Sequence, residues 1–455
     1  MTKLPKKTDL PSPSFPNILS EALEYGKKSG TGQVDLLLVE TIAVQYSQRM
    51  NKLEKLERAE SMDLGIRLFR GKRQVIVSTS DTSMSNIKKL IDQGLAMVDL
   101  VPEDPYCGLA ESSQLITKIP NLLMVDPVEP DISLLKERAQ ICEEAALSVQ
   151  GIYNSEGAES AWVKSNTHFA ASNGFQQSYS NTRHSLSVAV IAKSDQGMER
   201  DYDFSSTVFG KDLKDPAGIG QKGAERAVRR LNPQRINSGK MPVIFHPRIA
   251  NSFLGHLAAA INGASIARGT SFLKNQLHQQ IFPSSVTVMD HPLLEKGLAS
   301  RPFDAEGLPC KPQAMIDKGV LTDWLLDLRS ARQLKMMPNG HAVCGPSSLP
   351  SAGISNFYLE AGTVTPESLI KGIKSGLYVT ELIGDGVNLI TGDYSRGATG
   401  FWIENGSITY PVSELTIAGN LQEIFRNLIV ANNLSFNYRV NSPTLLVDSL
   451  MVAGS

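Results

Sequence analysis

Histidine can bind a metal ion or relay a proton near neutral pH, and two of the chain's 7 histidines stand in one apolar, Ala-rich stretch. This stretch is "HPRIANSFLGHLAAAINGASIARGTS", residues 246–271, with His246 and His256 10 positions apart. On an α-helix, that spacing separates two side chains by about 15 Å along the axis and about 80° around it, so they cannot share one ion. A zinc helix needs a close pair such as H-E-x-x-H, with the glutamate as general base. We therefore predict a helix that begins at Pro247 and whose histidines are structural or lie at the surface.

A second pair of candidate metal ligands is His341 with Cys344, in the stretch "NGHAVCGPSS". No other pair stands nearby, so further ligands would have to come from distant sequence, for example from His291. A Gly- and Pro-rich loop with an incidental pair is the simpler interpretation. The cysteines are scattered without a C-x-x-C pair, and we expect them to be reduced and mostly buried. They are Cys107, Cys142, Cys310 and Cys344.

Two patterns are of the kind that binds phosphate. "GIGQKG", residues 218–223, matches the dinucleotide-binding pattern G-x-G-x-x-G, but a polar segment broken by proline precedes it where a strand is required. We predict that these glycines shape a loop. The stretch 222–248 is basic, as in proteins that contact nucleic acid, yet it lacks interleaved aromatic residues, so a solvated helix face or an interface to an acidic partner is favoured. Its basic residues are Lys222, Arg226, Arg229, Arg230, Arg235, Lys240 and Arg248.

Charged residues bracketed by glycines mark two C-terminal segments, "HPLLEKGLASRPFDAEGLPCKPQAMIDKGVL" and "IGDGVNLITGDYSRGATGFWIENG". Glycines let a backbone approach a partner closely, which suits a groove that binds extended peptide by strand addition. Tight turns that need capping side chains explain the pattern nearly as well. The candidate groove or interface residues are Arg301, Asp304, Glu306, Asp385, Asp393 and Arg396.

The elements that must position these residues are those of an α+β protein. At 455 residues the chain exceeds one ordinary core, so two or more domains are expected. Residues 1–101 indicate an α+β unit of two helices and antiparallel strands, with a hairpin turn at 70–72. The polar segment 49–61 within it is expected to be a short helix or a mobile excursion. Residues 102–130 resemble a linker, since they carry several prolines.

Beyond the linker, residues 131–237 indicate a central α+β region packed with the N-terminal unit. Its helix at 132–149 precedes an antiparallel meander with turns at 172–174 and 195–197, and a helix at 216–232 closes it. From residue 238 to 455, short strands and frequent glycines predict a β-rich domain with a curled sheet or partly closed barrel.

Composition excludes several classes of protein. Lys plus Arg is 45 against Asp plus Glu 46, so no overall field attracts nucleic acid or an anionic membrane. No uncharged apolar run approaches the roughly 18 residues of a membrane helix. The first residues carry lysines and then prolines rather than an apolar core, unlike a signal peptide. We expect a cytoplasmic protein.

Four segments together resemble the TldD/PmbA family: "SRPFDAEG", "LLDLRSARQL", "GDYSRGATGFWIENGSITYPVSELTIAGNL" and the terminal "MVAGS". The resemblance spans nearly the whole chain, is densest in residues 240–455, and is to the PmbA/TldE-type subunit. In that family the TldD-type subunit carries H-E-x-x-x-H on a helix, and a later cysteine completes a zinc peptidase site. When "RGTS" (268–271) serves as the anchor, the two histidine positions fall on Leu254 and Ala259, and the glutamate position falls on Gly255.

The resemblance therefore implies a metal-free subunit, to which we assign no catalytic residue and no metal ligand. It would form a heterodimer with a zinc-containing, TldD-like chain and help to bind extended peptides such as leader peptides. Two alternatives stay open: an autonomous peptidase that uses His341, Cys344 and His291 as ligands, and a regulatory protein of the gyrase-modulator type. Self-association of the isolated chain as a homodimer is a further alternative that the sequence leaves open, because an exposed partner-binding face tends to find a substitute.

Overall fold

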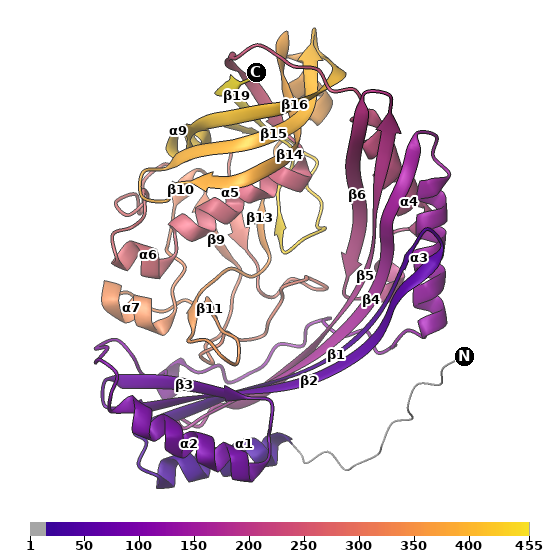
Figure 1. The fold of residues 1–455 in the computed structure, drawn as a ribbon. Helices are drawn as coiled ribbons and strands as arrows, with labels where there is room; N and C mark the ends of the chain where they lie inside the picture. The colour runs from indigo at the N-terminus through magenta and orange to yellow at the C-terminus, as the bar shows by residue number, and fades with distance from the viewer. Residues whose placement is uncertain (1–14, 455) are drawn as a thin grey trace.

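The computed structural model describes residues 15–454 of the chain (Figure 1). The proline-rich start, which we expect not to be a signal peptide, lies outside this range. None of the helices in residues 15–454 has the length and apolar character that crossing a membrane requires.

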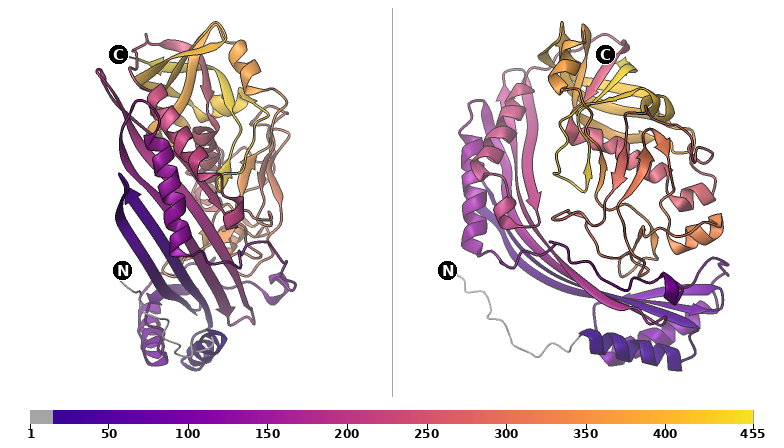
Figure 2. Two further views of the ribbon diagram at one scale, coloured as in Figure 1. Left: turned by 90° about the vertical axis from the view of Figure 1, so that its right-hand side faces the viewer. Right: turned by 180° about the vertical axis from the view of Figure 1, so that it is seen from behind.

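A six-stranded antiparallel sheet, in the order β3-β2-β1-β4-β5-β6, forms the N-terminal half of the described chain. Its strands come from both sides of residues 102–130, because β1 pairs with β4. The strands are long and the sheet bends into a half barrel that partly surrounds the C-terminal half (Figures 1 and 2). Their bounds are β1 Gln33–Arg49, β2 Lys52–Arg70, β3 Arg73–Thr79, β4 Ile152–Ala171, β5 Gln176–Ser194 and β6 Gly197–Thr207.

The predicted turns at 70–72, 172–174 and 195–197 are confirmed, since each joins two neighbouring strands of this sheet. The expectation of a helix or excursion at 49–61 is wrong. Most of that segment belongs to β2, and its residues pair with β1 in register, for example Arg58 with Val44. Residues 52–61 are exposed along their whole length. A strand that is solvated on both faces shows no apolar alternation, which is why the sequence hides it.

Four helices cover the convex face of the half barrel (Figure 1). α1 (Phe15–Lys28) and α2 (Met84–Val98) pack beneath one end, while α3 (Ile132–Leu147) and α4 (Pro216–Arg229) pack at the other. All four were expected from their apolar spacing. The loop predicted for "GIGQKG" is wrong, because these residues lie within α4. A Cβ at Gly220 would lie 2.0 Å from the carbonyl oxygen of Cys142, so this glycine lets α4 pack closely on α3.

The C-terminal half is built on a second sheet, in the order β16-β15-β14-β7-β19-β17. A further pairing of β16 with β19 closes its first five strands into a barrel, which confirms the curled sheet or barrel expected from the sequence. Asn405 and Gly406, both at positive φ, form the turn that joins β15 to β16. The strands are β7 Gly239–Phe245, β14 Ser375–Val387, β15 Asp393–Glu404, β16 Ser407–Asn420, β17 Leu428–Val430 and β19 Leu445–Ala453.

Smaller elements complete this half. A sheet in the order β10-β9-β8-β13-β18 and a β11–β12 pair lie between the barrel and the half barrel (Figure 1). Their bounds are β8 Val288–Asp290, β9 Gln313–Asp317, β10 Val320–Leu321, β11 Ala342–Val343, β12 Ser351–Ala352, β13 Phe357–Leu359 and β18 Val440–Asn441. The helices are α5 Pro247–Ala260, α6 Gly263–Ala267, α7 Leu328–Leu334, α8 Pro366–Lys371 and α9 Leu421–Arg426. Two 3₁₀ turns lie earlier in the chain, η1 Ser112–Gln114 and η2 Gly210–Asp212.

Residues 102–130 run between the two halves rather than around them (Figure 2). The backbone of Thr182 on β5 donates to Met124, and Lys296 of the C-terminal half donates to Leu123. Ile116 donates in turn to the backbone of Gly307. This segment therefore fastens the half barrel to the domain that lies against its concave face.

Candidate functional site

Helix α5 is the element that the family resemblance places at the zinc position. Leu254 is 3% exposed and belongs to the C-terminal hydrophobic core. Gly255 is exposed and Ala259 is half-buried on the same helix. The side chains of Leu254, Gly255 and Ala259 contain no nitrogen, oxygen or sulfur, so they cannot bind a cation or relay a proton.

The two histidines of the opening stretch have separate surroundings. His246 precedes α5 as its N-cap, and its Nδ1 accepts the backbone N–H of Arg248 at 3.1 Å. Burial and the nearby cations lower the pKa of His246 to about 3, so it is neutral and its proton lies on Nε2. His256 projects from the middle of α5, edge-on to the ring of Tyr394. Burial, and next the positive charge of Arg396, lower its pKa.

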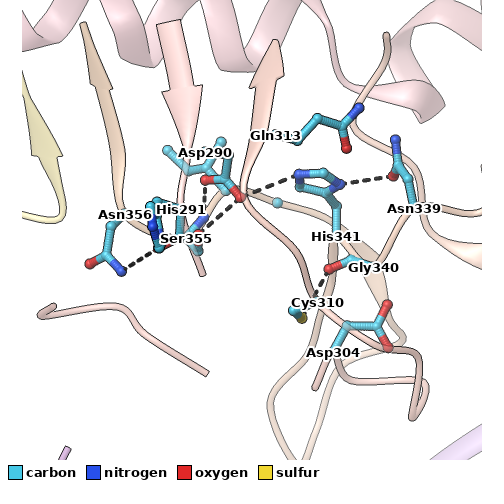
Figure 3. A network of polar contacts seen from close by, with 12 residues as sticks. Asp290, His291, Asp304, Cys310, Gln313, Asn339, Gly340, His341, Ser355 and Asn356 are labelled. Carbon is cyan, nitrogen blue, oxygen red and sulfur yellow. Dashed lines mark hydrogen bonds and ion pairs between the residues drawn. The ribbon is translucent and has the colours of Figure 1, made fainter. Parts of the chain in front are cut away.

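His341 is buried in a polar network (Figure 3). Its Nδ1 lies 2.8 Å from Oδ1 of Asn339, and its Nε2 lies 3.3 Å from Oδ2 of Asp290. Both ring nitrogens are thus occupied, whereas Cys344 lines a cavity beside Asp35. Among residues 15–454, no three His, Cys, Asp or Glu side chains are grouped as ligands for a metal ion. The geometry favours the loop interpretation of this pair.

The same network fixes two loops. Asp290 accepts the backbone N–H of Ser355 at 2.7 Å and its hydroxyl at 2.9 Å. The neighbouring Asn356 accepts the N–H of Ala299 and donates to the hydroxyl of Ser300 at 2.8 Å. Figure 3 shows Asn356, Ser355 and Asp290 side by side at the ends of their strands. Because these groups are buried and hydrogen-bonded, they hold residues 297–301 rigidly against residues 354–356.

These loops form one wall of a cavity of about 430 Å³, and the concave face of β4 and β5 forms the other. Three arginines from distant parts of the chain line it: Arg183 on β5, Arg301 in the first loop and Arg439 before β18. Other lining residues are polar or apolar but uncharged, namely Val163, Ser165, Tyr179, Asn181, Val208, Leu298 and Ile354. Within residues 15–454, none of the three arginines forms an ion pair with a carboxylate.

The cavity continues across the sheet. A neighbouring cavity of about 130 Å³ shares Tyr179, Arg301 and Val343 with it and extends over β4 to Leu37 on β1. A third, shallow hollow of only about 10 Å³ shares Leu37 with the second and is lined by Arg67. The three hollows form a groove that crosses the concave face from β5 to β2; we call it the concave groove.

Asp304 and Glu306, two of the predicted groove residues, are buried at the side of this groove. Asp304 accepts the backbone N–H groups of Glu306 and Leu308, each at 2.9 Å, which fixes the turn between them. Glu306 accepts the N–H of Leu328 at the start of α7. Burial and the adjacent carboxylate raise the pKa of Glu306 to about 8. Asp304 therefore caps its own turn, the alternative that the sequence left open, and it also reaches a groove wall. Glu306 instead binds the start of α7 and lines none of the three hollows.

The remaining candidates lie on the barrel. Asp393 accepts the hydroxyl of Thr391 at 2.6 Å at the start of β15, so it too caps a turn. Asp385 is exposed on β14. Arg396 on β15 and Asp385 both influence the pKa of His256, which places them near the outer face of α5. The structure thus brings Arg301 and Asp304 to the concave groove and leaves Asp385, Asp393 and Arg396 elsewhere.

The basic stretch 222–248 is largely neutralised by the chain's own acids. Arg226 lies 2.8 Å from Asp203, and Arg248 lies 2.7 Å from Asp201. Arg230 also contacts Asp201, and its side chain is only 9% exposed. A solvated helix face is therefore the wrong description for Arg230, which follows α4, and for Arg248 on α5, because both side chains pack against Asp201 of β6.

Comparisons with known proteins agree with this architecture. Models of the PmbA/TldA metallopeptidase match the chain in three parts: domain 1 at residues 34–98, the central domain at 126–231 and the C-terminal domain at 238–454. A protein of Escherichia coli named metalloprotease PmbA is 37% identical over 447 residues, which cover 96% of each chain. The chain belongs to the PmbA/TldD family.

Other members of the PmbA/TldD family also align with nearly the whole chain. A metalloprotease PmbA homolog of Haemophilus influenzae is 34% identical and aligns over 96% of this chain and 95% of its own. A crystal structure from Bacteroides thetaiotaomicron, described as a modulator of DNA gyrase, is 26% identical with a TM-score of 0.90, covering 98% of this chain and 100% of that one. TldE of Thermococcus kodakarensis shares the fold, with a TM-score of 0.85 at 18% identity over 96% of this chain and 100% of that one.

Sequence reasoning missed two of the three groove arginines. Arg183 and Arg439 stand in segments with no motif, and they meet Arg301 only because β5 and the residues before β18 flank the same loop. One signal was available for Arg183. The period of two along β5 puts Tyr179, Asn181 and Arg183 on one face, and that face lines the cavity.

Proposed function

We propose that this chain is the metal-free subunit of a cytoplasmic TldD/TldE-type zinc metallopeptidase and pairs with a TldD-like chain that carries the zinc. The proposal rests on the composition of α5, where the family resemblance places Leu254 and Ala259 at the positions of the two histidines and Gly255 at that of the glutamate. Leu254 is committed to the hydrophobic core, so this helix packs rather than catalyses.

The chain's contribution to the pair is the binding of an extended peptide within a shared chamber. The concave groove supports this role, because it follows the inner face of the half barrel across several strands and is lined by both apolar and polar side chains. A cleft with these features is the usual form of a ligand site. The substrates that suit it are unfolded or extended peptides, since a folded domain does not enter hollows of this size.

Co-purification with the TldD-like protein of the same cell, followed by a peptidase assay on an unstructured peptide, tests the proposal. The wild-type pair is expected to cleave the peptide. This chain alone, and a pair whose partner is mutated in its zinc helix, should both be inactive. Cleavage by this chain alone, or about one tightly held zinc ion per purified chain, would show instead an autonomous peptidase with unorthodox ligands.

A regulatory role toward DNA gyrase is the second candidate, because a solved relative is described as a modulator of that enzyme. Its support is weaker, since Arg226, Arg230 and Arg248 of the basic stretch are paired with Asp203 or Asp201. Phosphate contacts are strongest at low salt. A filter-binding assay with duplex DNA in low salt should therefore detect no binding, and tight binding there would favour this role over the first.

A further inference from the structure

Three arginines, Arg183, Arg301 and Arg439, line the larger cavity of the concave groove, and within residues 15–454 none of them forms an ion pair. The charge of the buried Asp304 acts on Arg301 only at longer range. Arg301 is 9% exposed and its Nε is buried without a hydrogen-bond partner. Its Nη2 donates to the carbonyl oxygen of Gly353 at 3.4 Å, and its side chain also contacts the thiol of Cys310. Arg183 donates to the carbonyl of Leu298 and Arg439 to that of Ile354, so backbone dipoles fix both side chains without neutralising them.

Three guanidinium groups around one cavity repel each other. Burial, and next the charges of Arg301 and Arg183, lower the pKa of Arg439, while Asp290 has the opposite effect. Asp290 is already engaged by Ser355 and His341 and lies behind the loops rather than in the cavity. Arg183 and Arg439 are exposed, whereas Arg301 is buried, and a buried cation without a close partner is costly. The arrangement is therefore a site prepared for an anion that enters from outside.

The shape of the site selects the kind of anion. The cavity holds about 430 Å³, lies between the sheet and two rigid loops and is open on one side, so its size suits the end of a chain rather than a nucleic-acid duplex. Guanidinium forks match the two oxygens of a carboxylate. The apolar lining from Val163, Val208, Leu298 and Ile354 offers room for one side chain next to the carboxylate.

The groove also has a direction. Its cationic end lies at Arg183, Arg301 and Arg439, whereas the only cation at its other end, Arg67, is paired with Asp35. An extended peptide that lies in the groove can therefore place a negative end on one side only. We propose that the cavity of Arg183, Arg301 and Arg439 binds the C-terminal carboxylate of the peptide, so that this subunit anchors substrates by their carboxyl end. The inference rests on the proposed function, because it assumes that the groove receives peptides.

Fluorescence anisotropy with the purified full chain tests the anchor directly. Three versions of one N-terminally labelled peptide serve as probes: the free acid, the C-terminal amide, and an amide whose last residue is glutamate. Charge-assisted hydrogen bonds predict that the free acid binds roughly 10- to 100-fold more tightly than the amide. Equal affinity for acid and amide, including no binding of either, overturns the inference. Tight binding of the glutamate amide overturns the assignment to a chain terminus, because the cavity would then read any carboxylate.

Variants connect this preference to the cavity. Arg183→Gln changes an exposed side chain and should leave the fold intact while reducing the preference for the free acid about tenfold. Arg301→Lys keeps the charge but removes the fork, and it should also reduce the preference. Arg426→Gln is the matched control, since Arg426 is an exposed arginine on α9 that lines none of the three hollows. An unchanged preference in Arg183→Gln, or an equal loss in the control, would contradict the assignment.

The two proposals fail in different ways. If the subunit role is wrong, the wild-type pair does not cleave the unstructured peptide. If only the anchor is wrong, the pair cleaves the free acid and the amide with the same KM. A difference in KM at unchanged kcat supports the anchor, because it reports binding of the carboxylate rather than the chemical step.

Discussion

Substitutions at two adjacent residues of α5 should change stability in opposite directions. Leu254 is 3% exposed within the hydrophobic core, so Leu254→Ala removes buried methyl groups and leaves a cavity. Substitutions of this kind cost about 2–5 kcal/mol. Gly255 is exposed, and a Cβ built on it meets nothing within 4 Å. In a helix interior, Ala is more favourable than Gly by about 0.5–1 kcal/mol, so Gly255→Ala should stabilise the chain.

Guanidinium chloride unfolding of the purified chain measures both effects. The midpoint should fall for Leu254→Ala and rise for Gly255→Ala, with an unchanged slope in each case. Each variant serves as the control for the other, because they occupy neighbouring positions on one helix and differ only in the face that they change. Peptidase activity of the reconstituted pair should persist in both variants.

Three results would refute this reasoning. If Leu254→Ala changed stability by less than about 0.5 kcal/mol, an amount typical of a surface position, α5 would not be a packing helix. If Gly255→Ala destabilised the isolated chain, the open face of α5 would be closed by contacts that the structure does not contain. If either variant lost the peptidase activity of the reconstituted pair at unchanged stability, α5 would take part in the chemistry rather than only in packing.

Three further predictions concern buried groups. The pKa of Glu306 is raised from 4.5 to about 8, so between these pH values the folded state holds a proton that the unfolded state releases. The free energy of unfolding should therefore fall as pH rises from 4.5 to about 8, by up to about 1.4 kcal/mol per pH unit. Glu306→Gln should flatten the profile of unfolding midpoint against pH. Gly220→Ala should lower the thermal midpoint, at a cost of about 1–3 kcal/mol, because its methyl group would overlap the carbonyl of Cys142. Arg67→Met should cost about 3–5 kcal/mol in denaturant unfolding by leaving the buried Asp35 unpaired, whereas replacing both residues by apolar ones should restore most of the loss.

The features that could be predicted from the sequence are those decided by residues close together along the chain. Glycine-containing turns and apolar spacing located the hairpins and the major helices, and the glycine-rich texture of the C-terminal half indicated a curled sheet. Helix spacing alone excluded a metal ion shared by His246 and His256. These features depend on residues within about 20 positions of one another, so a single sequence carries them.

Features that depend on long-range contacts were hidden. Residues 52–61 form a strand only because β1 provides its hydrogen-bonding partner, and their polar pattern carries no sign of it. The arginines of the groove are more than 100 positions apart along the chain and meet through tertiary structure. Gly220 was seen as part of a motif, but its role is set by the backbone of α3, which the motif does not contain.

The pairing of β1 with β4 also determines when the half barrel can form during synthesis. β1 ends at Arg49 and β4 begins at Ile152, so roughly 100 residues must leave the ribosome in between, which takes about 5–20 s at typical rates. During that interval the β1–β2 hairpin has one edge without a partner on the β1 side. The other edge, along residues 52–61, carries closely spaced lysines, arginine and glutamates, which discourage pairing with a second nascent chain. The charged residues 52–61, which gave no sign of a strand in the sequence, thus protect one edge of the hairpin from pairing with other chains while β4 is still being synthesised.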